Sequence, residues 1–100
     1  MQQQQEQPTP SAFDSAAWKA QRGVSPVDNK RVQMVSALQS AVQVGMKRSE
    51  VIALLGEPDS SDAASGADKY RLGLAMGPDE QFYEIRYEAD VVKSAALGQF

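Results

Sequence analysis

The sequence contains neither cysteine nor histidine among its 100 residues. Disulfide bonds, thiolate nucleophiles, zinc sites built from these residues and catalysis by an imidazole base are therefore excluded. Basic residues are also few, since ten lysines and arginines against thirteen acidic residues give a net charge of −3. That balance argues against nucleic-acid binding, which needs a basic surface. Together these absences favour a small acidic interaction domain without a cofactor over an enzyme.

Long apolar runs are missing as well, because no stretch approaches the roughly 18 residues of a transmembrane helix. The chain opens on a glutamine-rich polar tract, Met1–Gln7, with no signal peptide in view. Such a start is what remains when a signal segment is removed and an initiator methionine is added; a natural cytoplasmic start is the alternative. We expect residues 1–27 to form a disordered or weakly structured tail, with a short helix within 11–20, and residues 28–100 to form the domain.

The only tryptophan, Trp18, lies in this N-terminal segment. It can serve as a clasp that packs back on the domain or as an exposed anchor for a partner. We favour the clasp, because a small domain usually recruits large apolar groups to its core.

The body of the chain begins with two predicted helices. Asp28 can cap a first long helix that Gly45 ends, and a shorter helix at 48–55 is ended by Gly56. The first helix carries one apolar stripe, formed by Val32, Val35, Leu38 and Val42. The short link after it makes the pair a helical hairpin.

The rest of the chain is predicted to form a sheet. Residues 59–67 read as a mobile loop, after which apolar residues recur at every second position. The inward residues of the first two strands are Tyr70, Leu72, Leu74, Tyr83, Ile85 and Tyr87. Turns at Gly77–Asp79 and Ala89–Asp90 favour an antiparallel meander, so the expected fold is α+β, with the order α-α-β-β-β in two layers.

The third strand, from Val91 to about Leu97, leaves its buried face open. A slip of one residue exchanges the two faces of a strand. The inward set is therefore either Val92, Ser94 and Ala96 or Val91, Lys93, Ala95 and Leu97.

Four segments resemble the motifs of one protein family. Gly45–Val51 and Leu54–Asp59 resemble the "G-M-x-x-x-E-V … L-L-G-x-P-D" signature of the SmpA/OmlA (BamE-like) family. Tyr70–Gly73 looks like the aromatic-x-L-G first strand of that family, and Phe82–Glu88 resembles the strand that follows. The resemblance covers about residues 31–97.

The resemblance implies a two-helix layer on a three-stranded antiparallel sheet, in exported or lipid-anchored envelope proteins of Gram-negative bacteria. Members bind other envelope proteins, and the namesake is an accessory subunit of the outer-membrane β-barrel assembly machine. The same αα-βββ unit occurs as a protein-binding surface in β-lactamase inhibitor proteins.

The chain departs from the family pattern at two places. Lys47 replaces a capping Thr or Ser, so either only the Glu50 half of a capping box remains or Ser49 caps a shorter helix. The lipid-carrying cysteine of a mature lipoprotein is missing.

The charged residues show no catalytic or metal-binding spacing. Asp59, Asp62 and Asp68 lack the pattern of a calcium loop, so we expect solvated loop acids and no metal. The doublets Lys30-Arg31 and Lys47-Arg48 are likewise expected to be solvated, the alternative being that they face the acidic surface of a partner or phospholipid headgroups. Ser15 and Lys19 stand four residues apart, but nothing suggests that the lysine is desolvated enough to activate a serine.

The better binding candidates are the outward residues of the predicted sheet. This set is Lys69, Arg71, Phe82, Glu84 and Arg86. A phenylalanine between charges has the composition of an interface anchor with a polar rim. The alternative is that the 11–20 segment covers this face, with Trp18 on Phe82.

These observations predict a non-catalytic protein-binding module of the bacterial envelope. Its partner would be another envelope protein, and it would reach the membrane only through an N-terminal lipid anchor. The alternative is a cytoplasmic small-molecule-binding or regulatory domain. Its ligand would lie between the sheet and the 59–67 loop, in a pocket lined by Tyr70, Tyr83 and Tyr87.

Overall fold

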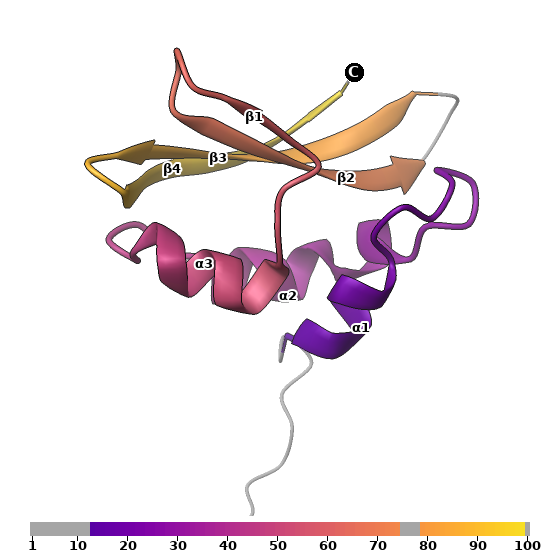
Figure 1. The fold of residues 1–100 in the computed structure, drawn as a ribbon. Coiled ribbons are helices and arrows are strands. Elements are labelled where there is room, and N and C mark those ends of the chain that lie inside the picture. The colour runs from indigo at the N-terminus through magenta and orange to yellow at the C-terminus, as the bar shows by residue number, and fades with distance from the viewer. Residues whose placement is uncertain (1–12, 75–78, 100) are drawn as a thin grey trace, which may run out of the picture.

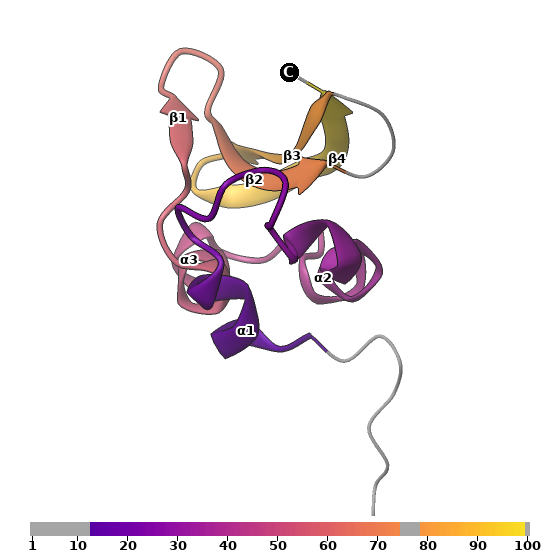
Figure 2. The same ribbon diagram turned by 90° about the vertical axis from the view of Figure 1, so that its right-hand side faces the viewer.

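The computed structural model describes residues 13–74 and 79–99. Within them, three short α-helices and one 3-10 turn precede a four-stranded antiparallel sheet. The helices all lie on one face of the sheet (Figures 1 and 2). The predicted α+β class is therefore confirmed, whereas the predicted count of three strands is wrong.

Helix α1, Ser15–Ala20, begins at Asp14, whose carboxylate accepts a hydrogen bond from the Ala17 amide at 3.0 Å. It falls within the predicted 11–20 segment. The helix contacts α3, so it belongs to the helical layer and does not cover the far face of the sheet (Figure 2). The placement of Trp18 over Phe82 is therefore wrong.

The predicted long helix from Asp28 to Gly45 is shorter and divided. A 3-10 turn, η1 (Arg31–Met34), leads into α2 (Val35–Ala41). Asp28 does not cap it, because its carboxylate accepts from the Ser25 hydroxyl at 3.2 Å. The helix ends early because the backbone is extended at Val42, with φ −100° and ψ 114°.

Helix α3, Arg48–Leu55, has the bounds that the sequence predicts. The amide of Lys47 donates to the Glu50 carboxylate at 2.9 Å, whereas the Lys47 side chain makes no capping bond. This is the half of the capping box expected to remain. Gly56 ends the helix at φ +78°, a conformation that strains residues with a Cβ.

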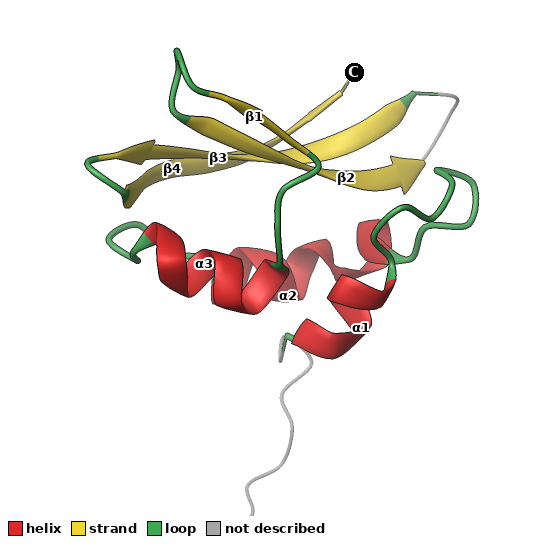
Figure 3. Ribbon diagram, viewed as in Figure 1, coloured by secondary structure: helices red, strands yellow, loops and turns green. Residues whose placement is uncertain are grey.

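The four strands follow one another across the sheet (Figure 3). Their bounds are β1 Ser60–Asp62, β2 Ala67–Leu74, β3 Glu80–Glu88 and β4 Val91–Gln99. Strand β1 lies in the segment predicted to be a mobile loop. It is fixed by a hydrogen bond from the Asp59 amide to the Lys69 carbonyl at 2.9 Å and by the Ser61 hydroxyl, which donates to Asp68 at 2.7 Å.

One of the two predicted turns lies wholly among the described residues. The predicted tight turn at Ala89–Asp90 is confirmed, with φ values of 53° and 64°. Residues 77 and 78 of the other predicted turn lie outside the described residues.

A bulge in β4 decides the face of the last strand. Tyr87 pairs with Val92 and Arg86 with Ser94, so Lys93 is an extra residue. Val92 is buried before the bulge, and Ala95 packs against the core after it. Of the two inward sets that the sequence left open, the one with Val92 is therefore correct before the bulge, and the one with Ala95 is correct after it.

The core lies between the helical layer and the inner face of the sheet. It comprises Trp18, Leu38, Val42, Val51, Leu55, Tyr70, Leu72, Tyr83, Ile85 and Val92. The predicted inward positions of β2 and β3 thus supply Tyr70, Leu72 and Ile85, each fully buried. Among the described residues, no helix has the length and apolar character needed to cross a membrane.

Candidate functional site

The sheet surface directed away from the helices, here called the outer face, carries the five predicted outward residues. Lys69 stands opposite Glu84, and Arg71 opposite Phe82, in the pairing of β2 with β3. Residues directly opposite each other lie on the same side of a sheet. Because the neighbouring Tyr70 is buried toward the helices, these side chains share the opposite side. The structure therefore brings them together as expected.

Phe82 occupies the middle of this face. The Lys69 ammonium lies 4.7 Å from the centroid of the Phe82 ring, within the range of a cation–π contact. On the other side the ring lies against the backbone of Gly98, where an added Cβ would stand only 2.6 Å from the ring tip. The ring is thus seated between a cation and a glycine, and any side chain at position 98 would displace it.

Charged groups on the same face form pairs of opposite sign. The guanidinium of Arg71 binds both carboxylate oxygens of Glu80, at 3.0 and 2.9 Å. Arg86 contacts Glu84 at 3.4 Å. The side chains of Arg71 and Arg86 are 56% and 52% exposed, so both remain accessible at the surface. The outer face therefore presents one aromatic group within a mixed-charge border.

Trp18, the remaining predicted binding residue, lies elsewhere. It is fully buried in the helical layer, where its indole N–H donates to the Leu55 carbonyl at 3.1 Å. Its ring also packs near those of Phe13 and Tyr70, at centroid distances of 5.7 and 6.1 Å. The predicted clasp is confirmed, and a buried tryptophan cannot serve as a surface anchor.

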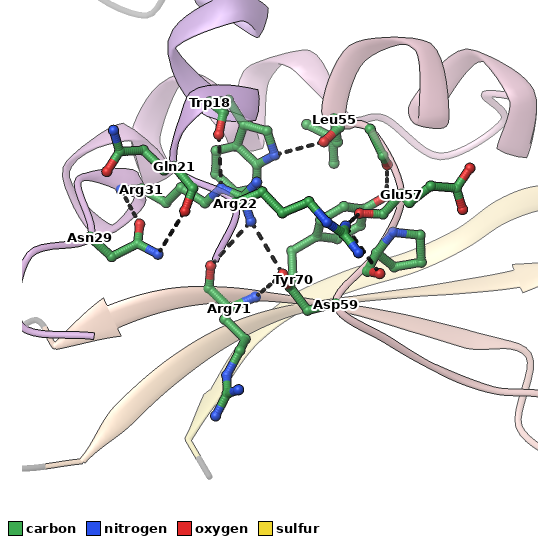
Figure 4. Close-up of polar contacts among 12 residues, drawn as sticks. Trp18, Gln21, Arg22, Asn29, Arg31, Leu55, Glu57, Asp59, Tyr70 and Arg71 are labelled. Carbon is green, nitrogen blue, oxygen red and sulfur yellow. Dashed lines mark hydrogen bonds and ion pairs between the residues drawn. The ribbon is translucent and has the colours of Figure 1, made fainter. Parts of the chain in front are cut away.

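Sequence reasoning missed a buried arginine. Arg31 was expected to be solvated, but it is only 1% exposed. Its Nε donates to the Trp18 carbonyl at 3.0 Å, and its Nη1 lies 3.2 Å from Asp59 (Figure 4). Burial lowers the pKa of Arg31, and the nearby Asp59 carboxylate opposes that shift. Asp59 was also expected to be a solvated loop acid, and it is instead the counter-ion of this arginine.

A second ion pair joins α3 to the sheet. Arg48, whose side chain is 39% exposed, lies 2.9 Å from the buried Asp68, so Asp68 is not the solvated acid expected and Arg48 is paired with it. The hydrogen bond to Asp68 raises the pKa of Arg48. The guanidinium also lies 5.7 Å from the Tyr87 ring centroid. The sequence around the basic doublets and the loop acids does not indicate these two ion pairs, because the two members of each pair are distant in sequence.

The three tyrosines of the alternative pocket are separated in the structure. Tyr70 and Tyr83 belong to the core, and the Tyr70 hydroxyl donates to the Gly56 carbonyl at 2.8 Å. Only Tyr87 lines the surface cavity beside the Ser61–Gly66 segment, which has a volume of about 500 Å³. The expectation that all three line one pocket is therefore wrong.

Ser15 and Lys19 each form a hydrogen bond to a backbone carbonyl. The Ser15 hydroxyl donates to the Leu54 carbonyl, and the Lys19 ammonium to the Ala53 carbonyl at 2.8 Å. Both side chains therefore attach α1 to the backbone of α3. Across residues 13–74 and 79–99, no three acidic side chains gather as metal ligands would.

Neither the scan against protein-family models nor the search of curated proteins returned a match for this chain.

Proposed function

We propose that this chain is a non-catalytic protein-binding module of the bacterial cell envelope, anchored to the outer membrane and related to the SmpA/OmlA (BamE-like) proteins. Its partner is another envelope protein, bound through the outer face of the sheet. The observation that carries the proposal is the position of Phe82. It is seated on Gly98 and shares its face with two ion pairs, on the side of the sheet that α1, α2 and α3 leave uncovered.

This arrangement suits protein recognition for a physical reason. Interface hot spots are usually large, rigid groups at the centre of a patch, with polar groups around them that exclude water. Phe82 supplies the rigid group, and Arg71 and Arg86 supply planar donors at its border. The outer positions of β4 carry only small groups, Ser94, Ala96 and Gly98. A partner can therefore approach the ring along β4 without a steric barrier.

The order of elements supports the family proposal. Helices α2 and α3 precede antiparallel strands β2, β3 and β4, which together reproduce the expected αα-βββ unit. Helix α1 and strand β1 are additions to that unit. Gly56 is the glycine of the family-like Leu54–Asp59 motif. Its φ is positive, a conformation that glycine adopts readily at the end of a helix.

Substitution of Phe82 tests the proposed face. Phe82→Asp should weaken capture of the envelope partner by roughly 30-fold, the effect of a hot-spot residue worth about 2 kcal/mol. Arg86→Glu should weaken it less, because its charge lies at the border. Val44→Asp is the matched control, since Val44 is 73% exposed on the link between the helices. Equal loss in the control, or no loss in Phe82→Asp with an unchanged melting temperature, contradicts the proposal.

Compartment is tested separately. The chain joined to its native upstream sequence should fractionate with the envelope, and addition of a lipid to a cysteine before residue 1 should be detectable by metabolic labelling. Recovery in the cytoplasm contradicts the proposed location.

The cavity beside Tyr87 supports a second candidate, a small-molecule-binding or regulatory role in the cytoplasm. It is lined by Arg48, Asp68 and the Ser61–Gly66 segment, which together offer charged and polar groups to a ligand. A metabolite that raises the melting temperature of the wild type, and does so less in Arg48→Gln, would favour this role over the envelope role.

A further inference from the structure

Strand β4 forms one edge of the sheet and β1 the other. The two edges differ greatly. Strand β1 is only three residues long and ends on the acidic Asp62, whereas β4 is nine residues long. Short or charged edge strands resist pairing with other chains, while long uncharged ones promote it. Only the β4 edge therefore has the character of a pairing surface.

The first part of the β4 edge is already occupied. The Gly45 amide donates to the Val92 carbonyl at 3.0 Å, and the Val92 amide donates to the Met46 carbonyl at 2.8 Å. Lys47 forms a bridge with Val91 in the same region. Beyond Val92, no segment of the described residues pairs with this edge, so the open part is the seven-residue stretch 93–99.

The open stretch carries one charge, on Lys93 at its beginning. The other residues are Ser94, Ala95, Ala96, Leu97, Gly98 and Gln99, with no proline among them. Leu97 is 46% exposed, and it is the one large apolar side chain of β4 among the exposed hydrophobic residues of the described chain. Nothing in these side chains prevents another strand from lying alongside.

The backbone groups of this stretch point outward at alternate residues. The Tyr87 amide donates to the Gly66 carbonyl, so Tyr87 is directed toward β2. Because alternate residues of a strand face the same neighbour, Ile85 and Tyr83 are directed toward β2 as well. Their partners on β4, Ala95 and Leu97, therefore direct their N–H and C=O groups away from the sheet.

We propose that β4 pairs antiparallel with β4 of a second copy of this chain, forming a continuous eight-stranded sheet across a two-fold axis. The axis passes at Ala96, the midpoint of the open stretch 93–99. This register pairs Ala95 with Leu97 of the other copy and keeps both copies clear of the link that occupies Val92. It also places the two Leu97 side chains as diagonal neighbours, which buries surface that is exposed in the monomer.

A second copy fits this edge for reasons of charge and symmetry. In the proposed register Lys93 stands opposite Gln99, so the two lysines lie at opposite ends of the interface and do not repel each other. The pairing leaves the outer face of each copy uncovered. The proposal therefore does not depend on the envelope function, and either can fail alone.

Sedimentation equilibrium of the full chain tests the proposal. The wild type should be a concentration-dependent dimer, and Leu97→Lys should be a monomer, because it brings two ammonium groups together at the axis. Val44→Lys is the matched control and should remain a dimer, because it makes the same exchange of an apolar for a charged side chain at a position that is 73% exposed and lies outside the stretch 93–99. Gln99→Pro, which removes an outward N–H that β3 does not use, should also weaken the dimer. Melting temperatures establish that each variant is folded.

The register is tested with a single cysteine in this cysteine-free chain. A spin label at Lys93→Cys should give an intermolecular distance near 20 Å, because six residue steps of about 3.4 Å separate the two positions along the paired strands. A wild type that stays monomeric into the millimolar range, a Leu97→Lys variant that still dimerises, or a much longer label distance would each overturn the proposal. A monomer would leave the edge to an extended segment of another protein.

Discussion

The guanidinium carbon of Arg31 lies 4.4 Å from the centroid of the Trp18 ring, and both side chains are buried. The same arginine donates to the Trp18 carbonyl and contacts Asp59 at the start of the sheet (Figure 4). One side chain thus connects α1, η1 and the segment before β1. The N-terminal residues from Phe13 onward are therefore part of the packed domain.

Removal of the Asp59 charge alone should cost more stability than removal of both charges of the Arg31–Asp59 pair. Asp59→Asn leaves a cation buried without an anionic partner and should lower the free energy of unfolding by about 3 kcal/mol. The asparagine oxygen can still accept the 2.9 Å hydrogen bond from the Arg71 amide, so the loss reports mainly the charge. Arg31→Met combined with Asp59→Asn removes the buried charge and should cost less than Asp59→Asn alone. Urea denaturation measures Asp59→Asn, Arg31→Met and the double variant.

Glu84→Gln is the control for this comparison. It breaks the exposed pair with Arg86 and should cost less than about 1 kcal/mol, because solvent screens surface charges. If the double variant loses as much free energy of unfolding as the two single variants together, the buried charge is not the reason why Asp59→Asn is destabilising.

Trp18 should be essential to the stability of the domain. Trp18→Ala creates a cavity between α1 and Tyr70 and removes the bond to the Leu55 carbonyl, so the free energy of unfolding should fall by about 3–5 kcal/mol. Val27→Ala, at a side chain that is 78% exposed, should change it by less than about 0.5 kcal/mol. Thermal melting followed by circular dichroism compares the two. A small effect at Trp18 would contradict its role as a clasp.

Two tyrosine hydroxyls should respond oppositely to removal. The Tyr87 hydroxyl oxygen is buried without a hydrogen-bond partner among the described residues, whereas the Tyr70 hydroxyl donates to Gly56. Tyr87→Phe should therefore stabilise the protein by about 1 kcal/mol, and Tyr70→Phe should destabilise it by about the same amount. Chemical denaturation of both variants checks the sign. Destabilisation by Tyr87→Phe would show that its hydroxyl is bonded in solution.

Stability should also fall in alkali. Burial raises the pKa of Tyr87 to about 12 and raises the pKa of Tyr70 and of Tyr83 above the ordinary value. The unfolded chain therefore loses these protons first, so the stabilisation is complete below pH 10 and is lost as the pH rises from 10 through 12. A tyrosine that is protonated in the folded chain and ionised in the unfolded chain contributes a slope of about 1.4 kcal/mol per pH unit. Urea titrations across this range should show a shallower slope in Tyr87→Phe.

Local patterns in the sequence were sufficient for much of the fold. The bounds of α3 follow from a dense apolar segment ended by Gly56, and the inward residues of β2 and β3 follow from strict alternation. The shared outer face of Phe82 and Arg71 follows from the same period. These features depend on neighbours within a few residues, so a single sequence contains the information.

The features that could not be predicted depend on contacts between distant residues. Strand β1 contains serine and aspartate, and it forms because Ser61 reaches Asp68 across the hairpin. The bulge at Lys93 changes the face of β4 without any glycine or proline to indicate it. The burial of Arg31 needs a partner 28 residues away. No local pattern distinguishes these residues from solvated polar ones.

Crosslinking from the outer face in living cells tests whether that face binds another protein. A photo-reactive amino acid in place of Ala96, on the outer face opposite Glu84, is compared with one in place of the exposed Gln39 on α2. We expect a discrete crosslink from position 96 to one envelope protein, separate in mass from any crosslink to a second copy of the chain, absent from position 39 and lost in Phe82→Asp. The same crosslinks from both positions, or a crosslink that survives Phe82→Asp, would contradict it.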